Sequence, residues 1–170
     1  VMAVAVVAAA CSGGGDEAGP VDPTAAPSLV EKSGDPAPTI AFEMFSGEQA
    51  TFADYAGKPL VVNFWASWCP SCVAEMSAAF LPAQVALGED VAFLGLNIQD
   101  ERAKALELVD ETGVLFDLAE DPTGQIYTEL GGLGMPFTVY ISAAGEVIDV
   151  HNGPLTEDQL VDQITEVLLS

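Results

Sequence analysis

The chain has 170 residues, a length typical of one domain, and half of these residues are hydrophobic, which is enough for a buried core. It carries 4 Lys and Arg residues against 26 Asp and Glu residues, which gives a formal net charge of −22. This charge excludes a nucleic-acid-binding protein, which needs a basic face, and it also opposes adsorption to anionic lipid headgroups. Three cysteines and one histidine are too few for a disulfide scaffold or a structural zinc site, so we expect no metal and no other cofactor.

The N-terminal residues 1–10 are apolar and uncharged. This run is shorter than the roughly 20 residues that span a bilayer, but it fits the apolar region of a secretory signal. Small residues precede Cys11, and a Ser and Gly run follows it, an arrangement that resembles a bacterial lipobox. We therefore expect an extracytoplasmic protein that is held on the bacterial cell membrane only by lipid on Cys11. The alternative is a plain signal peptide with an incidental cysteine.

Residues 11–38 are predicted to form a flexible tether after the lipidated cysteine. The stretch that follows Cys11 contains five of the eleven prolines and five glycines, and it has no periodic apolar pattern. Such a composition cannot bury enough apolar surface to offset the entropy of the chain. The folded domain is therefore predicted to comprise residues 39–170.

The folded domain is predicted to open with a hairpin and two buried strands. The hairpin comprises residues 39–44 and 50–52, which are joined by a Ser-Gly turn. Residues 60–64 and 91–96 are nearly continuous apolar runs, which are typical of central strands that are buried on both faces.

Two helices are expected in the middle of the domain. The first covers residues 70–87 between the two buried strands, and Pro82 should bend or break it. The second covers residues 101–112, with Asp100 as its N-cap and Gly113 as its C-terminal stop.

The last part of the chain is predicted to form a short helix, a hairpin and a final helix. The Asp-Pro pair at 121–122 is typical of a helix start, and residues 137–141 and 147–150 flank an Ala-Gly turn. Thr156 and Gln159 form a capping box at the start of the final helix. Together the elements indicate an α/β plan with a mixed sheet and right-handed crossovers. The apolar stripe of the final helix consists of Leu160, Val161, Ile164, Val167 and Leu168.

A pair of cysteines lies where the first buried strand ends and the first helix begins. At the helix start, Cys69 lies beside unpaired N–H groups and the positive end of the helix dipole, which stabilise its thiolate. Pro70 suits the first helical position because its missing N–H would have no partner there. Cys72 falls on the same side of the first turn, where it is close enough to bridge and more enclosed.

This asymmetry predicts thiol–disulfide exchange. A Cys69 thiolate attacks a disulfide of the partner, and Cys72 then attacks Cys69 to release the reduced partner; the reverse sequence oxidises a dithiol. A structural disulfide or half of a metal site are the alternatives. A two-residue gap closes too small a loop to stabilise a fold much, and the chain contains no second pair of metal ligands.

The segment from Ala37 to the C-terminus resembles the thioredoxin fold of the extracytoplasmic TlpA/ResA/CcmG branch. This resemblance implies a central mixed β-sheet flanked by helices, with an N-terminal β-hairpin extension. It also implies that Pro136 is a cis-proline that faces the dithiol. The motifs that carry the resemblance are Pro-x-Ile-x-Phe-x-Met from Pro38, Gly57-Lys58, the run from Asn63 to Cys69, and Gly134-Met135-Pro136-Phe137-Thr138.

The resemblance implies an exported thiol–disulfide oxidoreductase that works on protein thiols and disulfides. Its expected partners are client proteins and a membrane partner that recycles it, and we expect a monomer. Whether it works as a reductant or as an oxidant stays open. The alternatives are a peroxiredoxin-like peroxidase and a non-catalytic binding module. A peroxidase needs a Thr and a Pro upstream of its reactive cysteine, where this chain has Trp65, Ala66 and Ser67.

Two further positions refine the resemblance. Thioredoxin itself has a buried Asp where this chain has Asn63, and the TlpA/ResA/CcmG branch resembles this chain in having Asn. Asn cannot accept a proton as Asp does, so another base is needed for Cys72. Glu75 lies one helical turn further on and matches the active-site Glu of that branch, whereas from its spacing alone it reads as a solvated helix carboxylate. Met76-Ser77 departs from the family pattern, which often has a Pro two residues after this Glu.

Overall fold

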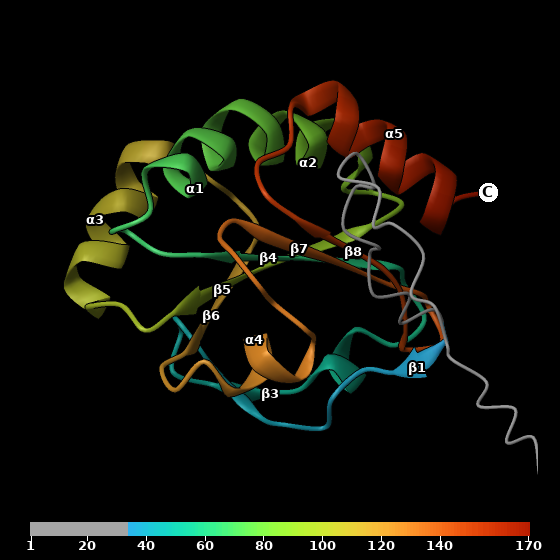
Figure 1. Cartoon of the computed structure of the whole chain (residues 1–170), viewed down its shortest axis with the longest axis horizontal. Coiled ribbons are helices and arrows are strands. Elements are labelled where there is room, and N and C mark those ends of the chain that lie inside the picture. Colours follow the sequence, from blue (N-terminus) through green and yellow to red (C-terminus); the bar gives the residue numbers. More distant parts are fainter. Residues whose placement is uncertain (1–33) are drawn as a thin grey trace, which may run out of the picture.

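The computed structural model describes residues 34–170, which form one eight-stranded mixed sheet with helices on both faces (Figure 1). The strands are ordered β1-β8-β7-β4-β5-β6-β2-β3. β4, β5 and β6 are parallel neighbours, whereas β7, β8 and the N-terminal strands pair in antiparallel fashion. The predicted mixed sheet and both predicted hairpins are therefore confirmed. The strands are β1 (Asp35–Pro36), β2 (Phe42–Met44), β3 (Gln49–Ala50), β4 (Leu60–Trp65), β5 (Ala92–Ile98), β6 (Asp117–Asp121), β7 (Phe137–Ile141) and β8 (Glu146–Asn152).

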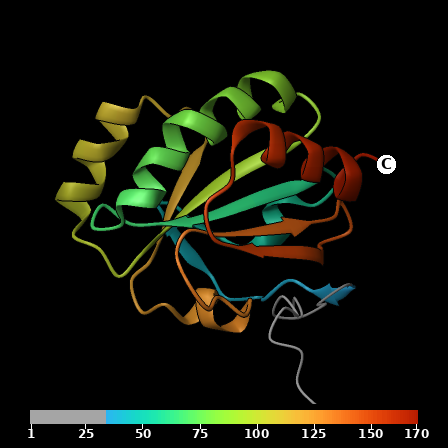
Figure 2. The ribbon, with the colours of Figure 1, turned by 45° about the horizontal axis from the view of Figure 1, so that its top comes forward.

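The helices divide between the two faces of the sheet. Figure 2 shows the long helical stretch and the C-terminal helix above the sheet, with α4 below it. One apolar cluster lies under α1, η2, α2, α3 and α5, and a second cluster lies between the opposite face and α4 with η1. The helices are η1 (Phe52–Tyr55), α1 (Pro70–Glu75), η2 (Met76–Phe80), α2 (Leu81–Leu87), α3 (Arg102–Thr112), α4 (Gln125–Glu129) and α5 (Glu157–Leu168).

Strand β4 is buried on both faces along its whole length, as its apolar run predicts. Val61 and Trp65 belong to the cluster beneath α1, and Leu60, Val62 and Phe64 belong to the opposite cluster. Because side chains alternate along a strand, Asn63 points to the α1 side as well. The strand therefore places one polar side chain inside the core, directly below the helix that carries the cysteines.

The predicted helix over residues 70–87 runs as α1, η2 and α2 without a break, and its irregularity lies just before Pro82. In the π-helical segment η2, the N–H of Leu81 donates to the carbonyl of Met76, five residues earlier. A proline ring clashes with the carbonyl four residues before it, and the wider turn moves that carbonyl away. The helix is therefore not broken at Pro82, and the irregularity that the proline predicts takes the form of one widened turn.

Strand β6 is missing from the predicted elements, and it displaces the start of the next helix. Its sequence is rich in acidic residues and does not read as a buried strand, yet it pairs with β5 and β2. Asp121 is the last residue of β6, and its carboxylate accepts hydrogen bonds from the backbone N–H groups of Gln125 (3.0 Å) and Tyr127 (2.9 Å). The prediction that a helix starts at residues 121–122 is therefore wrong, because Asp121 caps α4 from a position outside it.

The boundaries of α3 also differ from the prediction. Its N-cap is Glu101, and Asp100 precedes the helix with its carboxylate directed to the loop after β4. The prediction that Asp100 is the N-cap is therefore wrong. Gly113 does end the helix in the left-handed conformation, with φ 68°.

The sheet begins earlier than residue 39. Asp35 and Pro36 pair with Val147 and Glu146 of β8, inside the segment that composition assigns to the tether. Proline is compatible with this position because an edge strand leaves its backbone N–H side unpaired. The predicted signal region 1–10, Cys11 and the tether up to residue 33 lie outside the described residues. Over the described residues, no helix has both the length and the apolarity needed to cross a bilayer.

Candidate active site

The two cysteines lie at the junction of β4 and α1, at the C-terminal end of a central strand. Cys69 is the N-cap of α1 with extended backbone geometry, Pro70 occupies the first helical turn, and Cys72 lies in that same turn. The two Cα atoms are 5.3 Å apart, and the sulfurs form a disulfide. Cys69 retains 5% of its surface, whereas Cys72 is fully buried. The pair thus has one sulfur near the surface and one enclosed sulfur.

The start of α1 offers hydrogen-bond donors to the outer sulfur. The backbone N–H of Cys72 donates to Cys69 Sγ at 3.3 Å, and the Ser71 hydroxyl lies 3.5 Å from the same sulfur. Donors at a helix N-terminus stabilise negative charge, so they favour a thiolate on Cys69 once the disulfide is reduced. Burial without such donors disfavours a thiolate on Cys72.

The loop between β4 and α1 is held by one internal hydrogen bond and by the segment that follows β5. Within the loop, Cys69 N–H donates to the Ala66 carbonyl at 3.1 Å. The Trp68 indole N–H donates to the carbonyl of Gln99, which follows β5, at 3.2 Å. Ser67 is bound by the carboxylate of Asp100 through both its N–H and its hydroxyl. Sequence reasoning missed this contact because Asp100 stands just before a helix and resembles a cap.

Glu75 is buried between α1, β4 and the loop before α5, with only 3% of its surface exposed. One carboxylate oxygen accepts from the Asn63 side-chain amide at 3.1 Å, and the other accepts from the backbone N–H of Leu155 at 2.6 Å. Burial raises the pKa of Glu75 to about 7, although both hydrogen bonds act in the opposite direction. This burial excludes a solvated helix carboxylate and leaves a carboxyl group that titrates near neutral pH.

Polar atoms near Glu75 keep unused hydrogen-bonding capacity. Asn63 Oδ1 is buried without a hydrogen-bond partner among the described residues, and so is Oγ1 of Thr138, its cross-strand neighbour in β7. Both Asn63 and Leu155 donate to Glu75, which suits the ionised carboxylate. A rotated Asn63 amide can instead present its oxygen to protonated Glu75. The surroundings therefore suit a carboxyl group that changes its protonation state.

A groove of about 310 Å³ runs along α1 beside Glu75. It lies on the side of the helix that faces the loop before α5. Because Glu75 belongs to its lining, the groove brings solvent next to this buried side chain. Besides Glu75, its lining consists of Ser71, Ala74, Ala78, Pro154, Leu155, Thr156 and Glu157.

Pro136 follows a cis peptide bond from Met135 and directly precedes β7. The next residue, Phe137, pairs with Phe64 near the end of β4, so Pro136 lies at the same edge of the sheet as the cysteine loop. Its carbonyl accepts a hydrogen bond from Gly153 N–H at 2.9 Å. That Pro136 faces the dithiol stays a prediction.

Within residues 34–170, no group of three or more His, Cys, Asp or Glu side chains is arranged to hold a metal ion.

Comparison with known proteins agrees with this arrangement. Residues 32–168 match the redoxin family. The chain belongs to that family. It is 33% identical over 152 residues to the thiol:disulfide interchange protein HelX of Rhodobacter capsulatus, covering 86% of this chain and 82% of HelX. It is 26% identical over 139 residues to the thiol-disulfide oxidoreductase ResA of Halalkalibacterium halodurans, covering 82% of this chain and 78% of ResA.

A solved structure shows the same fold. The structure of MTB DsbF in its mixed oxidised and reduced forms matches with a TM-score of 0.69 at 25% identity, covering 75% of this chain and 94% of DsbF. The resemblance to the TlpA/ResA/CcmG branch and the thioredoxin-like fold are thus confirmed, and this redoxin is a thiol–disulfide oxidoreductase.

Burial of Glu75 predicts a specific pH dependence of stability. Because its pKa is about 7 in the folded protein and near 4.5 when exposed, its contribution to stability is full below pH 4.5 and is lost as the pH rises through 7. We expect the oxidised wild type to lose roughly 3 kcal/mol relative to Glu75→Gln across this interval. Urea denaturation at a series of pH values measures this difference.

The matched control is Glu107→Gln, which removes one negative charge from an exposed position of α3. A stability difference between wild type and Glu75→Gln that does not change with pH would show that Glu75 has the same pKa in the folded and unfolded protein, which would contradict a pKa raised by burial.

Proposed function

We propose that this redoxin is an extracytoplasmic enzyme, tethered to the bacterial membrane, that exchanges its Cys69–Cys72 dithiol or disulfide with protein partners. The observation that carries the proposal is the disulfide at the start of α1, with one sulfur near the surface and the other fully buried. A relative at 33% identity is named a thiol:disulfide interchange protein, which supports proteins as substrates.

Reduction of a partner proceeds in two displacements. The Cys69 thiolate attacks one sulfur of the partner disulfide, which forms a mixed disulfide and releases the other partner sulfur as a thiolate that takes up a proton. Cys72 then loses its proton and attacks Cys69 Sγ. The second partner sulfur leaves as a thiolate and is protonated in turn. Two electrons pass to the partner, and the Cys69–Cys72 disulfide remains; the same steps in reverse oxidise a partner dithiol.

Glu75 is the base for the second displacement. Cys72 is fully buried, and burial opposes the thiolate that it must form. Asn63 has no titratable group, whereas Glu75 lies one turn along the same helix with a pKa of about 7. A base is most efficient when its pKa is near the working pH. A useful fraction of it is then ionised and free to accept a proton, and it is still basic enough to take that proton from a thiol. The groove beside Glu75 supports return of the proton to solvent.

The net charge of the chain and the position of Pro136 indicate what kind of partner the enzyme binds. The net charge of −22 favours partners with a basic or neutral docking face, and binding should weaken as salt rises. Pro136, at the same sheet edge as the cysteine loop, contacts the bound partner chain. The partners are client proteins and a membrane protein that recycles the dithiol, and the enzyme works as a monomer.

Cysteine variants test the assignment of the two sulfurs. We expect Cys69→Ser to abolish exchange, whereas Cys72→Ser should retain the first displacement and accumulate a mixed disulfide, because nothing resolves it. Non-reducing gels detect the adduct with a model disulfide protein, and insulin reduction measures turnover. Adduct formation by Cys69→Ser in place of Cys72→Ser would reverse the assignment. Peroxide consumption without a second protein would instead identify a peroxidase.

Lipid on Cys11 would anchor the domain to the membrane. We expect Cys11→Ala to move the protein from the membrane fraction to the soluble or secreted fraction. Its insulin-reducing activity should stay unchanged. Cell fractionation with immunodetection measures this distribution. Retention of Cys11→Ala in the membrane fraction would contradict the lipid anchor.

A further inference from the structure

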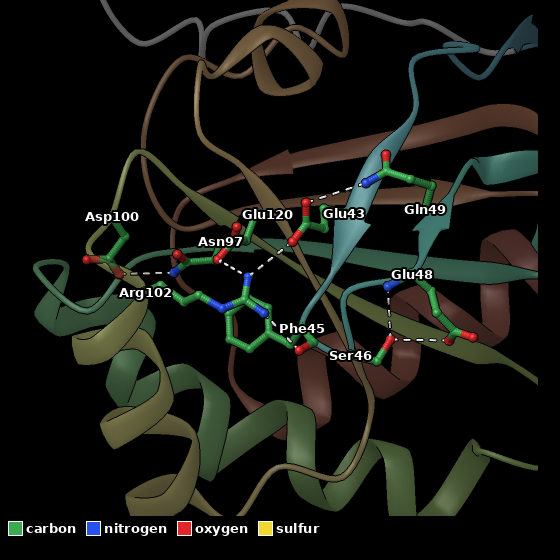
Figure 3. Close-up of polar contacts among 9 residues, drawn as sticks. All are labelled: Glu43, Phe45, Ser46, Glu48, Gln49, Asn97, Asp100, Arg102 and Glu120. Atoms are coloured by element: carbon green, nitrogen blue, oxygen red, sulfur yellow. Dashed lines mark hydrogen bonds and ion pairs between the residues drawn. The ribbon is translucent and has the colours of Figure 1, made fainter.

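The carboxylate of Asp100 binds the loop that carries Cys69. It accepts from Ser67 N–H at 2.5 Å, from the Ser67 hydroxyl at 2.7 Å, from the Asn97 side-chain amide at 3.0 Å and from Glu101 N–H at 2.8 Å. Figure 3 shows Asp100 and Asn97 in contact at the entrance to α3. One half-buried carboxylate therefore joins the loop after β4 to the segment after β5.

The anchored loop is short, and its position fixes that of the reactive sulfur. Ser67 precedes Cys69 by two residues, a length of chain that spans at most about 7 Å. The Trp68 indole also holds this loop, through the Gln99 carbonyl, but Trp68 is more than half exposed. Asp100 binds the loop through two hydrogen bonds from Ser67, and the buried side chain of Asn97 donates to the same carboxylate.

Asp100 also brings a negative charge to this loop. Partial burial works to raise its pKa, but the hydrogen bonds from Asn97, Ser67 and Glu101 outweigh burial and hold the pKa below its usual range. The carboxylate is consequently ionised at neutral pH.

Basic groups near Asp100 are engaged elsewhere. Arg102 forms an ion pair with Glu120 at 2.7 Å, donates to the Phe45 carbonyl at 2.8 Å and lies over the Phe45 ring (Figure 3). Lys104 forms its ion pair with Glu101. Across residues 34–170, no Lys or Arg lies within ion-pair distance of Asp100. The hydrogen bonds that Asp100 accepts therefore all come from neutral donors.

We propose that Asp100 is a positioning residue that fixes the cysteine loop and, through its charge, destabilises the Cys69 thiolate. This role rests on the exchange reaction proposed above. The start of α1 stabilises the thiolate, and so favours the reduced enzyme, while the charge of Asp100, which is bound to Ser67 two residues before Cys69, acts against it. A less stable thiolate shifts the pair toward its disulfide form. Asp100 therefore makes the dithiol a stronger reductant than the helix start alone would.

Two substitutions separate the charge from the anchoring. Asp100→Asn removes the charge and keeps an oxygen for Ser67 N–H, whereas Asp100→Ala removes both. We expect the Asn variant to shift its equilibrium with glutathione on the order of threefold toward the reduced enzyme, with the Cys69 pKa lower by about half a unit. Its rate constant for the first displacement should stay near that of wild type at a pH where Cys69 is fully ionised. The Ala variant should also lose on the order of tenfold in that rate constant, as a misplaced nucleophile does.

The measurements are redox equilibria in glutathione buffers, ultraviolet titration of the Cys69 thiolate, and stopped-flow attack on a model disulfide. Glu107→Gln is the matched control, since it removes one negative charge from an exposed position of α3 that does not contact this network, and it should leave all three unchanged. Circular dichroism melts report whether each variant is folded. Ser67→Ala is the milder second test of the anchor, and it should slow the attack without changing the charge.

An Asp100→Asn variant with the redox equilibrium and Cys69 pKa of wild type would overturn the charge effect. Asp100→Ala and Ser67→Ala variants that attack as fast as wild type would overturn the anchoring. Either of these outcomes would leave the proposed function intact, because each is a comparison with a wild-type enzyme that carries out thiol–disulfide exchange. Absence of exchange in wild type would instead contradict the proposed function itself.

Discussion

The burial of one carboxyl group, that of Glu75, is the constraint on which the active site depends. Its two oxygens accept hydrogen bonds from Asn63 in β4 and from the backbone before α5, so it joins the cysteine helix to the sheet and to the C-terminal segment. A buried carboxyl group opposes folding once it ionises. The free-energy cost of ionising Glu75 is limited here, because both hydrogen-bond partners are donors that stabilise the carboxylate. The carboxyl group can therefore exchange a proton near neutral pH.

The site contains two carboxyl groups in opposite environments. Glu75 is buried with two donors, and its pKa is raised to about 7, whereas Asp100 is half-buried with four donors, and its pKa is lowered. Environments that separate the pKa values of neighbouring acids also separate their roles. Glu75 can take up and release the proton of Cys72. Asp100 keeps its charge and acts on the loop that carries Cys69. The cysteines show the same division, with one sulfur at the helix start and the other enclosed.

Local patterns predicted much of the framework. The buried strands β4 and β5, the capping box at Thr156 and the stop at Gly113 all depend on residues that are neighbours in sequence. The same holds for Cys69 as the helix N-cap, because a strand, a CxxC pair and a proline occur in direct succession. In each case the physical cause lies within one turn or one strand, where the order of residues determines the geometry.

The features that sequence reasoning missed depend on contacts between distant segments. Asp100 meets Ser67 across 33 positions, and Glu75 meets the backbone of Leu155 across 80. Neither partner is visible from spacing, so Asp100 resembled a helix cap and Glu75 resembled a solvated side chain. Strand β6 was missed for the same reason. Its acidic sequence is explained only by its partners, including Arg102 from α3, which binds Glu120.

The most direct test of the role of Glu75 is the rate at which the mixed disulfide is resolved, measured across pH by stopped flow with the two displacements separated. In Glu75→Gln we expect slower resolution near neutral pH, a normal first attack by Cys69, and a deficit that shrinks at higher pH as solvent base takes over. Equal resolution rates for wild type and Glu75→Gln at every pH would contradict a role for Glu75 as the base for Cys72.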